Sequence, residues 1–291
     1  MRGAPWADGL SHMAADPLTL VGFVLEVAAI AVVSLYLRRH WLIINEEAQR
    51  GRNAGTQEEW NWHPLVALAV VAVSLTLQQY FGHHDTYSKV FGSFRESEYY
   101  PLGSFAWWAG WRVFGYVVLP LVAIVAMGDR VSDYGVAVRG QLKHLWIYGA
   151  LYLLVLPGVV LVSFTQPFQN TYPFYKCAGR SVFDFVAWEL LYAAQFVSLE
   201  FFFRGYMLQS LRRTMGAYAI FVMVMPYCMI HYGKPLLETT GAIVAGLVLG
   251  TLAMRTGSIW CGALIHVSVA LTMDILSLIH TGWRSWPFCG M

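Results

Sequence analysis

Residues 183–206 have the sequence FDFVAWELLYAAQFVSLEFFFRGY. A helix needs about 20 predominantly apolar residues to cross a lipid bilayer, and this segment is long enough to do so. Because the backbone must satisfy its own hydrogen bonds inside a bilayer, we expect an α-helix here. The segment carries Glu189, Glu200 and Arg204 in its interior. Ionisable side chains are costly inside a bilayer, so these three mark the helix as a candidate for function.

The composition of the whole chain is typical of a membrane protein. Of the 291 residues, 57% are hydrophobic and 12% are charged, whereas soluble domains have about 25% charged residues. The mean hydropathy is +0.51. These values exclude a soluble globular enzyme, a disordered chain and a coiled coil. The net charge of +2, with no concentration of Lys and Arg, argues against a nucleic-acid partner.

Apolar segments of similar length recur along the chain. They predict an all-α, polytopic membrane protein with about eight transmembrane helices. The expected spans lie near 17–37, 64–81, 104–127, 144–165, 183–206, 216–233, 239–254 and 258–280. We therefore divide the chain into four N-terminal spans with their loops (1–182), four C-terminal spans (183–280) and a tail (281–291).

Arginines at the ends of the spans indicate the orientation. Arg38–Arg39, Arg212–Arg213 and Arg255 lie directly against expected span ends, and such positions favour the cytoplasmic side. We therefore expect both termini outside the cytoplasm. In that orientation Cys177 and Cys289 lie on the same, non-cytoplasmic side. No spacing rule pairs these two cysteines, so a disulfide between them stays open.

Several ionisable residues fall inside the expected spans. They are Glu26, Arg112, Glu189, Glu200, Arg204, His231, His266 and Asp274. For Glu26, Arg112 and Asp274 we expect structural polar contacts. Glu189 precedes Glu200 by 11 residues, which is about 16 Å along a helix. These two carboxylates are therefore too far apart to share one water.

Glu200, His231 and His266 are expected at similar depths. Measured from the cytoplasmic ends of their spans, the depths are about 18 Å, about 22 Å and at most about 16 Å. A carboxylate can deprotonate a water, and two imidazoles can hold that water, donate to an oxyanion or bind a metal. The alternative is three separately satisfied buried polar residues.

Three motifs in the C-terminal spans resemble the signatures of a known family. Residues 199–213 read LEFFFRGYMLQSLRR and resemble EExxxR followed by Gly, with Glu200 as the second Glu and Arg204 as the Arg. Residues 227–231 read YCMIH and resemble FxxxH, with Tyr in place of Phe; residues 266–270 read HVSVA and resemble HxxxN. Order, spacing and flanks are similar to those of the CPBP family, the CAAX prenyl endopeptidases and bacteriocin-processing proteins, across roughly 183–280.

The resemblance implies an intramembrane endopeptidase with 183–280 as its CAAX-protease-like core. It implies catalytic roles for Glu200, His231, His266 and Arg204 and, further from the chemistry, supporting roles for Glu189 and Tyr227. Glu200 would activate a water that the two histidines hold. The implied partners are the lipid bilayer and a membrane-anchored or C-terminally sorted protein or peptide, in a bacterial inner membrane. No cofactor is expected; the alternative is Zn2+ on Glu200, His231 and His266, although no HExxH motif is present.

The chain departs from the family pattern at two positions. Leu199 stands where the family has the first Glu, taken to activate water, and Ala270 stands where it has Asn. Loss of one oxyanion donor typically costs about 2.7–4 kcal/mol of transition-state stabilisation. Glu200 could take the role of base, with Glu189 or Gln195 as polar support. The alternative is a catalytically impaired relative that binds a membrane partner or acts as an immunity protein.

Overall fold

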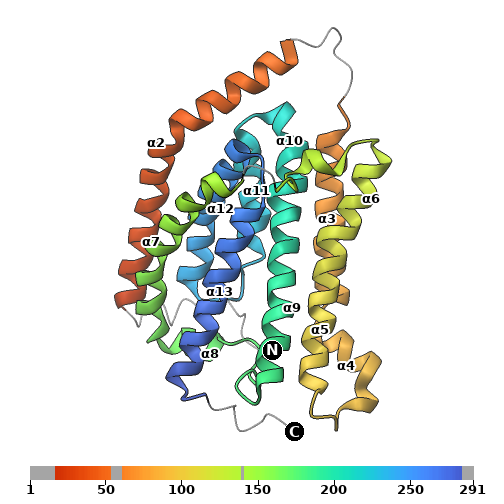
Figure 1. Ribbon diagram of the computed structural model, residues 1–291, viewed down its shortest axis with the longest axis vertical. Coiled ribbons are helices and arrows are strands. Elements are labelled where there is room, and N and C mark those ends of the chain that lie inside the picture. Colours follow the sequence, from red (N-terminus) through yellow and green to blue (C-terminus); the bar gives the residue numbers. More distant parts are fainter. Residues whose placement is uncertain (1–16, 54–60, 139–140, 284–291) are drawn as a thin grey trace, which may run out of the picture.

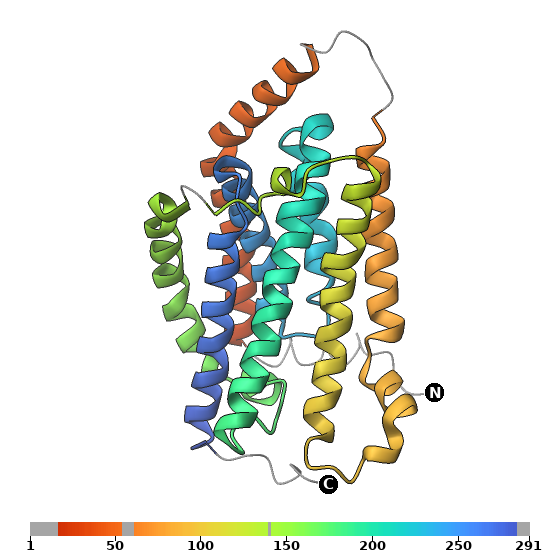
Figure 2. The same cartoon turned by 45° about the vertical axis from the view of Figure 1, so that its right-hand side comes forward.

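The computed structural model describes residues 17–53, 61–138 and 141–283. Within these ranges the chain is helical and contains no strand. Figures 1 and 2 show the long helices running side by side along one axis, with α9 near the centre of the bundle. An elongated helical bundle of this kind is the arrangement expected of a chain whose backbone must be satisfied within lipid.

Seven of the described helices are long and apolar enough to cross a membrane. They are α2 (Pro17–Asn53), α3 (His63–Phe81), the continuous α5–η2–α6 (Tyr100–Val113, Phe114–Val118, Leu119–Ala126), α7 (Leu145–Ser163), the continuous α9–η5–α10 (Val182–Glu200, Phe201–Met207, Leu208–Met215), α12 (Leu236–Thr256) and α13 (Trp260–His280). Shorter elements are α4 (His84–Phe91), η1 (Gly92–Phe94), η3 (Val131–Tyr134), η4 (Gln141–His144), α8 (Gln166–Thr171) and α11 (Tyr218–Met229). The predicted all-α, multi-pass membrane protein is confirmed.

The expected span 216–233 is a shorter helix than predicted. It corresponds to α11, whose 12 residues are fewer than the about 20 needed to cross a bilayer. After Met229 the chain turns, and Gly233 adopts a φ of 92°, a left-handed conformation that favours glycine. The turn leaves His231 buried inside the bundle.

The helices pack around α9. It lies between α5 and α13, while α12 packs against α2 and α11, and α7 covers α13. Large apolar side chains on the outer helices are exposed, among them Leu25 and Leu35 of α2 and Leu154 and Leu161 of α7. Exposed leucines on helices of this length are what contact with lipid acyl chains requires.

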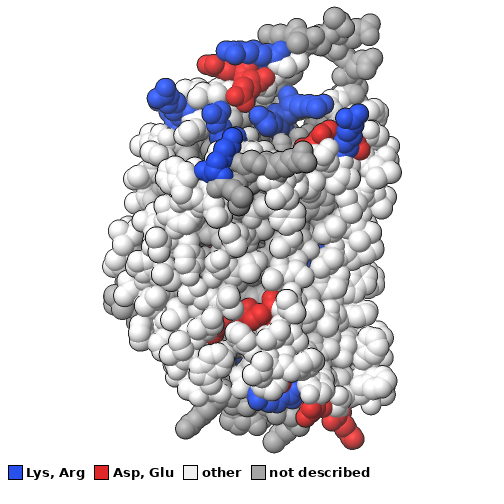
Figure 3. Space-filling model, viewed as in Figure 1, with Lys and Arg blue, Asp and Glu red and all other residues white. Residues whose placement is uncertain are grey.

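Most of the Lys and Arg side chains visible in Figure 3 gather at one end of the bundle, the upper end of that view. Glu47 of α2 lies 3.2 Å from Arg212 of α10 and 3.5 Å from Arg255 of α12. Cys177 precedes α9 and so lies towards the opposite end; it is disulfide-bonded, and Cys289 lies outside the described residues. Disulfides persist in oxidising compartments; the orientation of the bundle in the membrane stays a prediction.

Candidate active site

A carboxylate and an imidazole meet between α9 and α13. Glu200 is buried, and its Oε1 lies 2.6 Å from Nδ1 of His266. An ionised carboxylate only accepts hydrogen bonds, so Nδ1 carries the proton and donates to Glu200. In a neutral His266 the other nitrogen, Nε2, is then an acceptor. The carboxylate thus fixes the tautomer of the histidine.

Arg204 compensates the buried charge of Glu200. Its Nη1 lies 3.0 Å from Glu200 Oε1, and both side chains are almost fully buried. Arg204 belongs to η5, a π-helical turn directly after Glu200, and such turns are frequent at functional sites. A Cβ on the adjacent Gly205 would come within 2.7 Å of the Tyr134 carbonyl oxygen. Glycine is therefore needed beside Arg204 for η5 to pack here.

Tyr227 of α11 completes a hydrogen-bonded chain across three helices. Its hydroxyl lies 2.9 Å from His266 Nε2. Because Nε2 is an acceptor, the tyrosine hydroxyl donates. The Arg204 guanidinium carbon lies 4.0 Å from the centroid of the Tyr227 ring, within the range of a cation–π contact. Glu200, His266 and Tyr227 are thus connected in series, with Arg204 beside both ends.

His231 packs against the same tyrosine. Its Nδ1 lies 2.7 Å from the Tyr227 carbonyl oxygen, and the two rings meet edge to face at 4.9 Å. A carbonyl only accepts, so Nδ1 donates and Nε2 of the neutral ring is an acceptor. His231 in this tautomer can hold a water by accepting its hydrogen bond. It cannot donate to an oxyanion until it is protonated.

The two positions that depart from the family pattern are packed in apolar surroundings. Leu199 belongs to the large apolar core that includes Phe201 and Phe202. Ala270 belongs to a second core whose members include Trp188 and Phe196. Neither position presents a polar group, so the polar chemistry of the site comes from Glu200 and its neighbours.

Glu189 lies apart from this group. It is beside Asp274 of α13, and the Asp274 Oδ2 accepts a hydrogen bond of 2.6 Å from the indole N–H of Trp188. The 11 residues between Glu189 and Glu200 correspond to about 16 Å along α9. Glu189 and Asp274 therefore form a separate polar contact between α9 and α13.

Gly262 and Phe196 also belong to the site, but prediction from the sequence missed them because neither has a charged or hydrogen-bonding side chain. A Cβ on Gly262 of α13 would lie 2.7 Å from Glu200 Oε2, and the Phe196 ring stacks on His266 at 5.4 Å. Gly262 precedes His266 by four residues, and Phe196 precedes Glu200 by four. Helical residues four apart share a face, so this spacing is the signal that could have found both.

Gly262 supports a first prediction. Gly262→Ala should lower the rate of catalysis about 100-fold, because the added methyl group forces the Glu200 carboxylate to move and a misplacement of about 1 Å costs about that factor. The matched control is Gly149→Ala, where a Cβ meets nothing within 4 Å. Initial rates of both variants, reconstituted in the same lipid, make the comparison. A Gly262→Ala rate equal to that of the control would contradict the close packing of Glu200 on α13.

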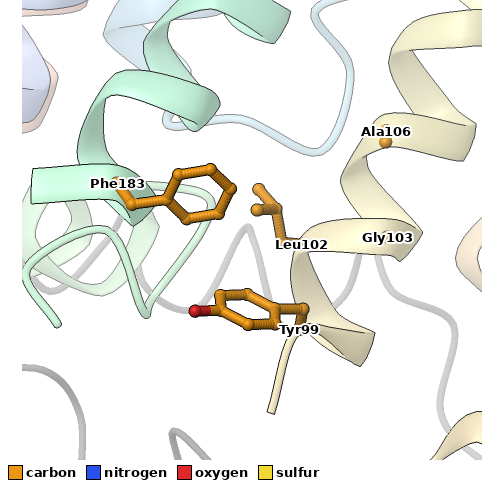
Figure 4. Close-up of a pocket in the computed structure, with 5 residues that line it drawn as sticks. All are labelled: Tyr99, Leu102, Gly103, Ala106 and Phe183. Atoms are coloured by element: carbon orange, nitrogen blue, oxygen red, sulfur yellow. The ribbon is translucent and has the colours of Figure 1, made fainter. Parts of the chain in front are cut away.

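An apolar pocket lies elsewhere, between α5 and α9. It has a volume of about 440 Å³ and is lined by Tyr99, Leu102, Gly103, Ala106 and Phe183 (Figure 4). Phe183 precedes Glu200 by 17 residues on α9, which corresponds to about 25 Å along the helix. The pocket is therefore not part of the site around Glu200.

The arrangement of Glu200, His231 and His266 does not suit zinc. His266 uses one ring nitrogen for Glu200 and the other for Tyr227, and His231 directs Nδ1 to a carbonyl. Across residues 17–53, 61–138 and 141–283, no group of three or more His, Cys, Asp or Glu side chains is placed to hold a metal ion. A catalytic zinc site needs three protein ligands, and these three side chains do not offer them together.

Comparison with known proteins agrees with the motifs of the C-terminal spans. Residues 181–272 match the family model described as type II CAAX prenyl endopeptidase Rce1-like. The matched segment is about a third of the chain and includes Glu200, Arg204, Tyr227, His231 and His266. No curated protein and no solved structure matches the chain. The resemblance to the CPBP family is thus confirmed: residues 181–272, which extend from the start of α9 into α13, are similar to a CAAX-type peptidase family.

Proposed function

We propose that this protein is an intramembrane endopeptidase that hydrolyses a peptide bond of a membrane-anchored or C-terminally sorted protein. The observation that carries this proposal is the hydrogen-bonded series Glu200–His266–Tyr227 inside a bundle of membrane-spanning helices. The series lies within the segment that matches a peptidase family. A bacterial inner membrane is the proposed location, with the end that carries the disulfide-bonded Cys177 outside the cytoplasm.

In the proposed reaction Glu200 and His266 act as one base. The carboxylate holds His266 in the tautomer whose Nε2 accepts a proton, and it stabilises the imidazolium that results. His231 Nε2 accepts a hydrogen bond from the attacking water. Arg204 keeps Glu200 ionised and in place. The partial exposure of His266, 16% of its side chain, indicates the side from which water and the peptide bond approach.

A cleavage assay tests the proposed function. Purified protein in proteoliposomes is incubated with a panel of membrane-anchored peptides that differ in their C-terminal tails, and products are identified by mass spectrometry. The expected result is a product with a new C-terminus that does not form with His266→Ala. The endopeptidase proposal fails if two results coincide. No peptide of the panel is cleaved, and cells that carry His266→Ala behave like cells that carry the wild-type protein.

Leu199 and Ala270 favour a second candidate function. Because both positions are apolar and packed, the fold could serve to bind a membrane partner or to confer immunity without hydrolysis. A protein that only binds a partner depends on its surface residues and does not need the buried series Glu200–His266–Tyr227. Phenotypes that survive substitution of Glu200 and His266, but not substitutions on the surface, would favour this function.

Metal removal gives a second prediction. Treatment with a strong chelator should leave the rate of cleavage unchanged within error, because both nitrogens of His266 are already hydrogen-bonded to protein groups. Rates are measured before and after chelation, together with metal analysis of the purified protein. Loss of activity that returns with added Zn2+ would instead assign Glu200, His231 and His266 to a metal site.

A further inference from the structure

The Tyr227 hydroxyl fills the hydrogen-bonding position at Nε2 of His266. The Tyr227 hydroxyl is 2.9 Å from His266 Nε2, and Nδ1 of the same ring is 2.6 Å from Glu200. Both nitrogens of the imidazole are thus occupied. A proton can reach the Glu200–His266 pair through Nε2 only by way of the Tyr227 hydroxyl.

The direction of these hydrogen bonds allows proton transfer. Glu200 accepts from Nδ1 and Nε2 accepts from Tyr227. The Tyr227 oxygen has two lone pairs; the Arg204 guanidinium interacts with this hydroxyl, and the second lone pair can accept from a water. A carboxylate, an imidazole and a hydroxyl follow one another in the same order in the catalytic triad of a serine hydrolase, where the carboxylate orients the histidine and the histidine takes the hydroxyl proton. Here the three groups come from α9, α13 and α11.

Arg204 is placed to stabilise negative charge on Tyr227. Its guanidinium carbon lies 4.0 Å from the ring centroid, and both residues are at most 1% exposed. Charge interactions are strong in such a poorly solvated site. A phenolate that forms transiently at Tyr227 would therefore be offset by a cation that the fold already holds in position through Glu200.

We propose that Tyr227 is a catalytic residue of the proposed peptidase, relaying the proton of the attacking water to His266 and returning it to the leaving nitrogen. This inference rests on the proposed function. The motif that residues 227–231 resemble has Phe at its first position, so the relay is a property of this chain. It supplies a polar group at the site in a chain that has Leu199 and Ala270 at two polar positions of the family pattern.

The reaction balances with this relay. As the water oxygen bonds to the carbonyl carbon, its proton moves to the Tyr227 oxygen, and the hydroxyl proton of Tyr227 moves to His266 Nε2. The carbonyl π electrons pass to the oxygen, which becomes the oxyanion. The oxyanion then returns its electron pair to re-form the C=O bond as the C–N bond breaks with its electron pair on nitrogen. The nitrogen takes a proton from Tyr227, while Tyr227 regains one from His266. One water is consumed and the side chains return to their starting state.

Tyr227→Phe is the direct test, because it keeps the ring and removes only the hydroxyl. We expect kcat to fall about 10²- to 10⁴-fold, the usual contribution of a general acid–base group, with KM and the unfolding midpoint unchanged. The matched control is Tyr116→Phe. Tyr116 is also fully buried and also packs on Phe203, but its hydroxyl bonds to Arg112 and is outside the series. Its kcat should equal that of the wild type.

Two further measurements separate a proton relay from a structural hydroxyl. Incorporation of 3-fluorotyrosine at position 227, which makes the phenol more acidic, should shift the pH–rate profile to lower pH. Nitrogen NMR of labelled histidine should show His266 protonated at Nδ1, with an Nε2 signal that changes in Tyr227→Phe. The NMR measurement tests the hydrogen-bonded arrangement independently of cleavage. If the wild type cleaves no substrate, the proposed function fails and the catalytic role of Tyr227 fails with it; an unchanged Nε2 signal in Tyr227→Phe would overturn the relay by itself. Wild-type cleavage combined with full activity of Tyr227→Phe would overturn the relay and leave the proposed function intact.

Discussion

Glu200→Gln should lower the rate of peptide hydrolysis about 10⁴-fold. The Glu200 carboxylate fixes His266 in the tautomer whose Nε2 accepts a proton. A Gln side chain can instead donate to Nδ1, which places the proton on Nε2 and blocks transfer from Tyr227. Loss of the carboxylate that orients a catalytic histidine has about this effect on kcat in serine proteases. Single-turnover rates in proteoliposomes measure the loss.

The control for this substitution is Glu26→Gln. Glu26 lies within the membrane on α2 and accepts a hydrogen bond from Thr240, a contact that Gln preserves, so its rate should stay at the wild-type value. His266→Ala should lower the rate as much as Glu200→Gln does, although it leaves the Glu200–Arg204 ion pair intact. Unfolding midpoints measured in parallel separate loss of chemistry from loss of fold. Wild-type rates in Glu200→Gln would remove Glu200 from the role of base, and loss only in Glu189→Gln would move that role to Glu189.

Arg204→Met should lower the free energy of unfolding by about 3–5 kcal/mol, the cost of leaving a buried charge without its partner. Glu200 and Arg204 are at most 1% exposed and 3.0 Å apart, so neither charge can turn to solvent when the other is removed. Methionine keeps much of the volume of the arginine side chain. Denaturant unfolding in detergent micelles gives the free energy, and the slope of the transition shows whether it remains cooperative.

The double variant Glu200→Gln/Arg204→Met is the control for the ion pair. Replacement of both partners of a buried ion pair by uncharged groups is often nearly neutral. The double variant should therefore recover most of the stability that Arg204→Met loses. Equal losses in the single and the double variant would show that Arg204 stabilises the fold through packing alone.

Much of this fold and part of its site could be predicted from the sequence. An apolar segment of about 20 residues satisfies its backbone hydrogen bonds in a bilayer by forming an α-helix. The long helices could therefore be predicted from the apolar composition of their segments. The depth of Glu200 is counted from Arg212 in its own helix and that of His266 from Arg255 at the end of the preceding helix. These depths place the two side chains at one level, and they meet at 2.6 Å. Residues 216–233 were less predictable, because apolarity alone does not show that α11 ends at Met229 and that the chain turns at Gly233.

The remaining features of the site depend on which faces of the helices meet. The hydrogen bond from Tyr227 to His266 and the fit of Glu200 against Gly262 require the rotation of α11 and α13 relative to α9. Helical periodicity is too weak in uniformly apolar segments to give that rotation. The π-helical turn Phe201–Met207 is likewise invisible in the sequence, since one turn of altered hydrogen bonding leaves no repeating pattern.

The most direct test of the account is hydrolysis in 18O-labelled water. Wild-type protein in proteoliposomes should release a product whose new C-terminal carboxylate contains one 18O atom, because the reaction that Glu200, His266 and Tyr227 support adds one water across the peptide bond. Glu200→Gln should form no labelled product in the same time, and Glu26→Gln should form the wild-type amount. Labelled product from Glu200→Gln at the wild-type rate would contradict the central claim that this buried series is the hydrolytic site.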